Sequence, residues 1–129
     1  MIEIGLTGRS ETVVTPENTA AAVGSGLVPV FATPMMIALM ENAAAGAVAP
    51  YLEAGQGTVG TKLEVTHDAA TPIGMKVWAE AELLEIDRKR LVFQVRAFDE
   101  AGPIGGGRHE RFIIRTEAFL EKAESKLDR

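Results

Sequence analysis

Cysteine is absent from this chain of 129 residues. Its absence excludes disulfides, thiolate nucleophiles, cysteine-based zinc sites and iron–sulfur clusters. Histidine is scarce as well: the chain has 2 histidines, too few for an all-histidine metal cage. We therefore expect that the protein works without a metal and without a separate cofactor.

Positive charge is also in short supply. The chain has 13 lysines and arginines against 18 aspartates and glutamates, for a net charge of -5. An acidic surface disfavours binding along a phosphate backbone. We expect no nucleic-acid partner.

Long uninterrupted apolar runs are missing too. Residues 26–52 are the most apolar stretch, but they include three prolines, Glu41 and Asn42. A carboxylate in the middle of a bilayer span costs a few kcal/mol. The first residues, Met1–Ile4, lack the basic start and apolar core of a signal peptide. We therefore expect no membrane segment, and we take the cytoplasm as the compartment.

The chain does have an ordinary globular composition, with 47% hydrophobic and 24% charged residues. Its length fits a single domain over residues 1–129. A domain of that size buries roughly two-thirds of the surface that its unfolded chain exposes. One hydrophobic core is therefore expected.

The clearest element is a helix that begins near Thr33 and ends at Pro50. Thr33 is a good N-cap, and Pro34 suits the first helical position. The residues from Met35 to Ala49 are apolar almost all round, which is typical of a helix buried on most sides. Proline then stops the helix.

Strands are predicted on both sides of this helix. We expect a strand pair at residues 2–6 and 12–14, followed by a loop over residues 15–27 that is long enough to act as a lid. After the helix, period-two alternation predicts strands over residues 59–68, 75–83, 91–97 and 104–115, and then an amphipathic helix over 116–127. In the first of these strands one face holds Val59, Thr61, Leu63, Val65 and His67. This α+β pattern resembles the hotdog fold, in which a curved antiparallel sheet wraps one central helix and dimers form edge to edge.

Three polar residues stand out against these elements. Glu41 lies two turns into the apolar helix, and it is either a reactive carboxylate or part of a solvated stripe with Asn42. His67 points to the core side of its strand, either as a structural histidine or at the lip of a pocket. Thr33 either caps the helix or faces a reacting carbonyl beside the amides of Met35 and Met36, which could stabilise an oxyanion.

Two other motifs have ordinary explanations. The triplet Gly105–Gly107 lacks the lysine and hydroxyl residue of a phosphate loop, and it does not open a helix. Glycines in a strand indicate a bulge or a close backbone approach. Arg88, Lys89 and Arg90 are expected in a solvated hairpin turn, with contact to an anionic cofactor as the alternative reading.

Several segments together are similar to the fluoroacetyl-CoA thioesterase family of hotdog proteins. They occur in order and with kept spacing over residues 28 to 120: Val30-Phe31-Ala32-Thr33, Leu39-Met40-Glu41, Ala49-Pro50-Tyr51-Leu52-Glu53, Gly57-Thr58-Val59-Gly60-Thr61, Val65-Thr66-His67-Asp68-Ala69-Ala70-Thr71-Pro72 and Gly107-Arg108-His109-Glu110-Arg111. The resemblance implies a catalytic set of Thr33, Glu41 and His67, with Gly60 and Arg111 around the site. It also implies a homodimer whose site lies at the interface, with His67 facing the partner's helix. Pairing of dimers into a tetramer is left open.

The resemblance implies hydrolysis of an acyl-CoA thioester. Glu41 would activate water or attack the carbonyl directly, while Thr33 orients and His67 transfers protons. In the fluoroacetate-specific enzyme of that family the lid before the helix carries an aromatic residue, whereas residues 15–30 contain none here. We therefore expect a short-chain or aromatic acyl-CoA substrate rather than fluoroacetyl-CoA. Two alternatives remain: a hotdog dehydratase acting on acyl thioesters, and an acyl-CoA binding module without turnover.

Overall fold

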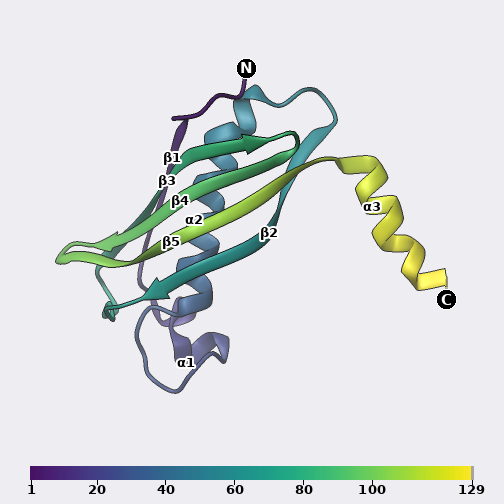
Figure 1. Cartoon of the computed structure of the whole chain (residues 1–129). Coiled ribbons are helices and arrows are strands. Elements are labelled where there is room, and N and C mark those ends of the chain that lie inside the picture. Colours follow the sequence, from purple (N-terminus) through teal and green to yellow (C-terminus); the bar gives the residue numbers. More distant parts are fainter. Residues whose placement is uncertain (129) are drawn as a thin grey trace.

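The computed structural model describes residues 1–128. Five antiparallel strands form one sheet in the order β1-β3-β4-β5-β2. Their bounds are β1 Thr7–Val13, β2 Gln56–His67, β3 Lys76–Asp87, β4 Arg90–Asp99 and β5 Gly102–Arg115. The long helix α2, Thr33–Val48, lies across the concave side of this curved sheet (Figure 1). The fold is therefore the α+β hotdog arrangement that the sequence predicts.

Short helical segments complete the chain. The turn η1 (Pro16–Asn18) and the helix α1 (Ala20–Val23) come before α2, and η2 (Ala49–Tyr51) follows it. After β5, α3 (Thr116–Glu124) and η3 (Ser125–Asp128) extend away from the sheet (Figure 1). No helix in the described part of the chain has the length and apolarity to cross a bilayer.

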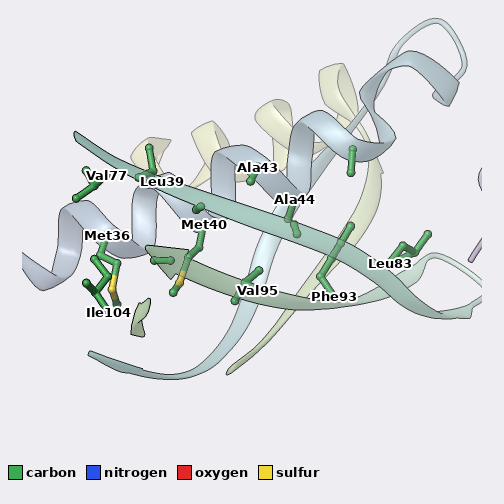
Figure 2. Packing of buried hydrophobic residues seen from close by; sticks show 14 of the residues in the cluster. Met36, Leu39, Met40, Ala43, Ala44, Val77, Leu83, Phe93, Val95 and Ile104 are labelled. Carbon is green, nitrogen blue, oxygen red and sulfur yellow. The ribbon is translucent and has the colours of Figure 1, made fainter. Parts of the chain in front are cut away.

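The core lies between α2 and the concave face of the sheet. The helix contributes large and small apolar side chains, among them Met36, Met40 and Ala44, which are fully buried. The inner residues of β3 and β4 alternate as predicted, and the buried ones are Val77, Ala79, Ala81 and Leu83 on β3 and Leu91, Phe93, Val95 and Ala97 on β4. Across the pair, Ala79 faces Ala97, Ala81 faces Val95 and Leu83 faces Phe93. Figure 2 shows side chains of α2, among them Met36, Met40 and Ala44, together with Val77, Leu83, Phe93 and Val95 of the sheet. A helix enclosed in this way is apolar nearly all round because the sheet curves around it.

The predicted N-terminal strand pair is wrong. One strand, β1, forms over Thr7–Val13, and the chain turns at Gly5 with a φ of 99°. The inner residues of β1 are small because α2 passes very close: a Cβ on Gly8 would overlap the carbonyl oxygen of Ala43. The apolar alternation over residues 2–6 therefore predicted a strand where none forms, and the strand follows at Thr7–Val13.

The start of α2 differs by one residue from the prediction. The N-cap is Ala32, and Thr33 is the first residue within the helix. The amides of Met35 and Met36 both donate to the carbonyl oxygen of Ala32, at 3.0 Å each. Both amides therefore already have an acceptor inside the helix, and the part they play toward a substrate oxyanion stays an expectation. The predicted loop over residues 15–27 also contains η1 and α1.

In β2 the predicted inner face holds only in its second half. The pairing with β5 shifts register between Gly60 and Lys62, where a bulge inserts one residue. A bulge moves every preceding side chain to the other face. Thr58 and Gly60 therefore share the inner face with Leu63, Val65 and His67, while Val59 and Thr61 do not. This shift brings Gly60 to the helix.

The glycine triplet lies in β5 and allows a close backbone approach, as predicted. A Cβ on Gly105 would overlap the carbonyl oxygen of Thr66, and one on Gly107 would overlap that of Glu64. Both contacts are to β2, its neighbour in the sheet. The turn at Asp87–Arg90 is the expected solvated hairpin, with Arg88 at a φ of 58°.

Candidate active site

Two polar clusters lie along α2, one at its start and one two turns further on. At the start, Thr33 opens the helix and His67 ends β2. The hydroxyl of Thr33 and Nδ1 of His67 form a hydrogen bond of 2.7 Å. The other ring nitrogen of His67, Nε2, is buried and has no hydrogen-bond partner. A buried ring nitrogen without a partner is positioned to exchange a proton with a bound molecule.

A cavity of about 280 Å³ opens beside this pair. Thr33 and His67 line it together with Ser25–Val28 from the predicted lid, and with Asp68–Ala70 from the loop after β2. Leu27 is 94% exposed at its rim. Apart from the threonine, the histidine, Ser25 and Asp68, the lining of this cavity is apolar, and it includes the buried aromatic side chain of Phe31.

The second cluster surrounds Glu41. The side chain of Arg111 enters it from β5, with its Nη1 3.5 Å from Oε2 of Glu41. Thr58 on β2 holds the rest of the guanidinium: Nε donates to the Thr58 hydroxyl at 2.9 Å and Nη2 to the Thr58 carbonyl at 3.0 Å. Arg111 is 7% exposed, while the Glu41 side chain is 38% exposed. The carboxylate therefore has a buried cation on one side and access to solvent on the other.

Gly60 closes this cluster on the β2 side. A Cβ there would overlap Oε2 of Glu41 and would lie 3.1 Å from Cε1 of His109. The absence of a side chain at this position gives the carboxylate its space. Glu41, Gly60 and Arg111 thus come together as the resemblance implies.

Burial shifts the pKa values of two groups in this cluster. Desolvation lowers the pKa of His109, and the nearby Arg111 charge lowers it further, against the backbone hydrogen bond to Lys62 and the Glu41 charge. Desolvation also lowers the pKa of Arg111, while the Glu41 carboxylate opposes that shift. Both effects arise because water is excluded from the inner face of β5.

The two clusters do not meet within one chain. Thr33 and Glu41 are eight positions apart on α2, which separates them by about 12 Å along the helix axis at 1.5 Å per residue. Nδ1 of His67 contacts the chain's own helix, so Nε2 is the ring nitrogen left for another contact. The carboxylate on one side, and the hydroxyl and imidazole on the other, therefore occupy two separate clusters.

Two residues of the second cluster, His109 and Thr58, were not predicted. His109 is fully buried and contacts Arg111, and Thr58 makes two hydrogen bonds to the same side chain. The signal for His109 is its place two residues before Arg111 in a strand, which puts both on one face. The described residues contain no group of three histidine, aspartate or glutamate side chains placed to bind a metal ion.

Comparisons with known proteins identify the family of this chain. Residues 14–117 match the family model described as fluoroacetyl-CoA-specific thioesterase. A fluoroacetyl-CoA thioesterase of Streptantibioticus cattleyicolor is 48% identical over 97 residues, which cover 75% of this chain and 70% of that protein. A solved structure of the fluoroacetyl-CoA thioesterase FlK is 39% identical, with a TM-score of 0.92 over 98% of both chains.

A more distant structure supports the same class. A hypothetical protein of Thermus thermophilus, a thioesterase superfamily member, is 34% identical with a TM-score of 0.88 over 99% of this chain and 97% of its own. The fold and these relatives define a hotdog-fold thioesterase, an enzyme that hydrolyses acyl-CoA thioesters. The chain belongs to the fluoroacetyl-CoA-specific thioesterase family, which confirms the resemblance found in the sequence.

Proposed function

We propose that this thioesterase hydrolyses short-chain or aromatic acyl-CoA substrates with Glu41, Thr33 and His67 as its catalytic residues. The observation that carries this proposal is Glu41, a half-exposed carboxylate on an apolar helix that faces one buried cation. Such a carboxylate is fixed in place and still open to a substrate or a water. Gly60 and Arg111 shape its surroundings.

The reaction adds water across the thioester bond and releases a carboxylic acid and the CoA thiol. In one route Glu41 removes a proton from water as it attacks the carbonyl. In the other Glu41 attacks first, expels the CoA thiolate and forms a mixed anhydride that water then cleaves. In this proposal Nδ1 of His67 donates to the Thr33 hydroxyl, which leaves the Thr33 hydrogen free to donate to the substrate and orient it. Nε2 of His67 takes up a proton from water and passes it to the leaving sulfur. Single-turnover reaction in heavy-oxygen water tests the anhydride route: when water attacks the Glu41 carbonyl carbon of the anhydride, the label stays on Glu41 and the released acid is unlabelled. Direct attack of water on the thioester puts the label in the acid and never on Glu41.

We further propose that the working site is shared between two copies of the chain. The outer edge of β2 has no neighbour among the described strands, and antiparallel pairing of two such edges continues both sheets. A pair centred near Leu63 and Glu64 sets His67 of one chain opposite Gly60 of the other. The Thr33–His67 half-site then lies beside the Glu41 half-site across the interface. Sizing in solution tests for this homodimer, and it also reveals any tetramer.

The substrate proposal rests on the rim of the cavity. The residues before α2 that form its rim, Ser25 to Val28, include no aromatic side chain, and the aromatic ring in the lining comes from the buried Phe31. A small apolar cavity accepts a short acyl group, and an open rim leaves space for a flat ring.

We propose the cytoplasm as the compartment, and cell fractionation tests this.

The first experiment is a free-thiol release assay across acetyl-, fluoroacetyl-, phenylacetyl- and medium-chain acyl-CoA. We expect release from the short-chain or aromatic group, with fluoroacetyl-CoA a poorer substrate. Preference for fluoroacetyl-CoA contradicts the substrate proposal. Stabilisation by acyl-CoA without release, or hydration of an unsaturated acyl-CoA, contradicts hydrolysis itself.

The variant Glu41→Gln tests the catalytic carboxylate. We expect kcat to fall about 100- to 10,000-fold, the contribution of a positioned acid or base. The matched control is Glu124→Gln, because Glu124 is an exposed carboxylate at the end of α3, outside β2 and both polar clusters. Turnover of the Glu41 variant close to that of the control removes Glu41 from the mechanism.

A further inference from the structure

His109 is a buried polar residue on the inner face of the sheet, and the proposed hydrolysis gives it no role. It lies in β5, it is fully buried, and its ring is 6.4 Å from the ring of Phe93. Burying an imidazole requires hydrogen bonds for its two nitrogens. His109 has both, and they define what the residue does.

The two hydrogen bonds assign the proton on the ring. Nδ1 lies 2.9 Å from the carbonyl oxygen of Lys62, which can only accept. Nδ1 must therefore carry hydrogen. Nε2 lies 3.1 Å from Nη1 of Arg111, which can only donate. Nε2 therefore presents its lone pair.

A second proton on the ring would break this arrangement. It would set an N–H of His109 against an N–H of Arg111 and place two cations in contact. The other charged groups near the ring are the carboxylates of Glu41, on α2, and Glu110, on β5, and burial outweighs them in lowering the pKa of His109. His109 stays neutral near pH 7.

Arg111 is the group that this neutral ring controls. Thr58 holds Nε and Nη2, while Nη1 is shared between Nε2 of His109 and Oε2 of Glu41. Because a guanidinium is planar and rigid, fixing Nη1 on one side sets where it points on the other. The contacts thus form a series from the Lys62 backbone through His109 and Arg111 to Glu41.

We propose that His109 is a positioning residue that acts through Arg111: its Nε2 accepts from Nη1 and so aims the guanidinium at the Glu41 carboxylate. This inference rests on the proposed role of Glu41. It requires an acceptor at the place of Nε2, not a titrating group.

Two variants separate the acceptor from mere packing. In His109→Gln the side-chain oxygen replaces Nε2 as an acceptor, whereas His109→Leu fills space without one. We expect kcat of the leucine variant to fall about 10- to 100-fold, the range for a hydrogen bond to a charged group, with KM within about threefold. We expect the glutamine variant to keep kcat within about threefold.

The control for lost stability is Leu83→Val, a change in a fully buried side chain of β3. We expect it to lower the melting temperature and leave kcat unchanged. The proposal is overturned if the leucine variant keeps full kcat, if glutamine falls as far as leucine, or if the control loses kcat in the same proportion.

A measurement independent of turnover covers the case in which no acyl-CoA is hydrolysed. Nitrogen NMR of the imidazole rings, assigned by comparison with His109→Gln, reports the tautomer in the folded protein. We expect a neutral His109 ring with hydrogen on Nδ1. Hydrogen on Nε2, or a charged ring at neutral pH, overturns the inference even in an active enzyme. If NMR shows the expected tautomer but the protein hydrolyses no acyl-CoA, the proposed function is refuted. The catalytic purpose of the positioning by His109 is then refuted with it.

Discussion

The backbone of Gly60 lies so close to Glu41 that one methyl group decides where the carboxylate sits. In Gly60→Ala the new Cβ overlaps Oε2, the end of a flexible side chain, so Glu41 moves while the sheet stays. We expect kcat to fall about 100-fold, the effect of a displacement near 1 Å in a catalytic group. Steady-state kinetics and a thermal melt together distinguish displacement from unfolding.

The matched control is Gly46→Ala, a glycine-to-alanine change on the same helix as Glu41. Gly46 lies within α2, and a Cβ there meets nothing within 4 Å. Alanine in a helix interior stabilises by about 0.5–1 kcal/mol relative to glycine, so the melting temperature should rise while turnover is unchanged. Equal activity in the two variants would show that the space at Gly60 has no catalytic importance.

The buried His109 also makes folding stability depend on pH. Its folded pKa lies below the ordinary 6.5, because burial disfavours the charged ring. The unfolded chain therefore binds a proton below about pH 6.5 that the folded chain does not, and stability falls as pH drops. The loss approaches about 1.4 kcal/mol per pH unit between the unfolded and folded pKa values. Arg111, Glu41 and Glu110 are the charged groups that bear on this titration.

Denaturant unfolding from pH 7.5 to 5 measures this slope against His109→Gln, since carboxylates contribute equally to both proteins. We expect the variant to lose less stability over the same range. Parallel curves for the two proteins would contradict a neutral, buried His109.

The individual site residues were predictable to different degrees. Glu41 is conspicuous in the sequence because it interrupts the apolar residues of α2. His67 is conspicuous because it continues the inner face of β2. His109 and Thr58 were missed. His109 could have been found from its place two residues before Arg111, which puts both on one strand face, whereas the face of Thr58 is set by the bulge in β2. The spacing of Thr33 and Glu41 puts both on one helix face. It also separates them by about 12 Å along the helix axis, and the sequence alone does not show how that distance is bridged.

At the scale of elements, the contact between β2 and β5 depends on missing side chains. A Cβ on Gly105 would overlap the backbone carbonyl of Thr66 and would lie 3.0 Å from Sδ of Met36. Backbone cannot move aside as a side-chain end can, so Gly105→Ala must separate the strands or shift α2. We expect a loss of about 1–3 kcal/mol or more in unfolding free energy, measured by denaturant titration.

This variant also tests how β5 supports the site. Because His67 pairs with Gly105 in the register, separation of the strands at that end disturbs the Thr33–His67 half-site as well. Activity should fall together with stability, in contrast to Gly60→Ala, where activity falls alone. A stable, active Gly105→Ala would contradict the close approach.

The elements that the sequence predicts well are those with a long, uniform pattern. The inner faces of β3 and β4 and the span of α2 follow from periodicity, because each side chain there meets the same core. The prediction failed at β1, where small residues face the helix, and in β2, where one extra residue reversed the alternation. Both failures depend on how closely distant segments approach, which no local pattern contains.

At the scale of the whole molecule, the two half-sites make a prediction that a single-chain site does not. The double variant Thr33→Ala/His67→Ala lacks one half-site, and Glu41→Gln lacks the other. Each protein alone should be inactive. If the site is shared across a dimer, a mixed dimer contains one site with the intact Thr33–His67 pair of one chain and the intact Glu41 of the other. Its second site carries both lesions.

Random mixing at equal amounts gives mixed dimers in about half of the population, each with one working site of two, so about a quarter of wild-type activity should return. The subunits are exchanged by co-expression with two different tags, and tandem purification isolates the mixed species, which should then reach about half. A control mixture of Glu41→Gln with itself under both tags excludes effects of the tags. A mixed dimer as inactive as its parents would mean that Glu41, Thr33 and His67 must all come from one chain, against the roughly two helical turns that separate them.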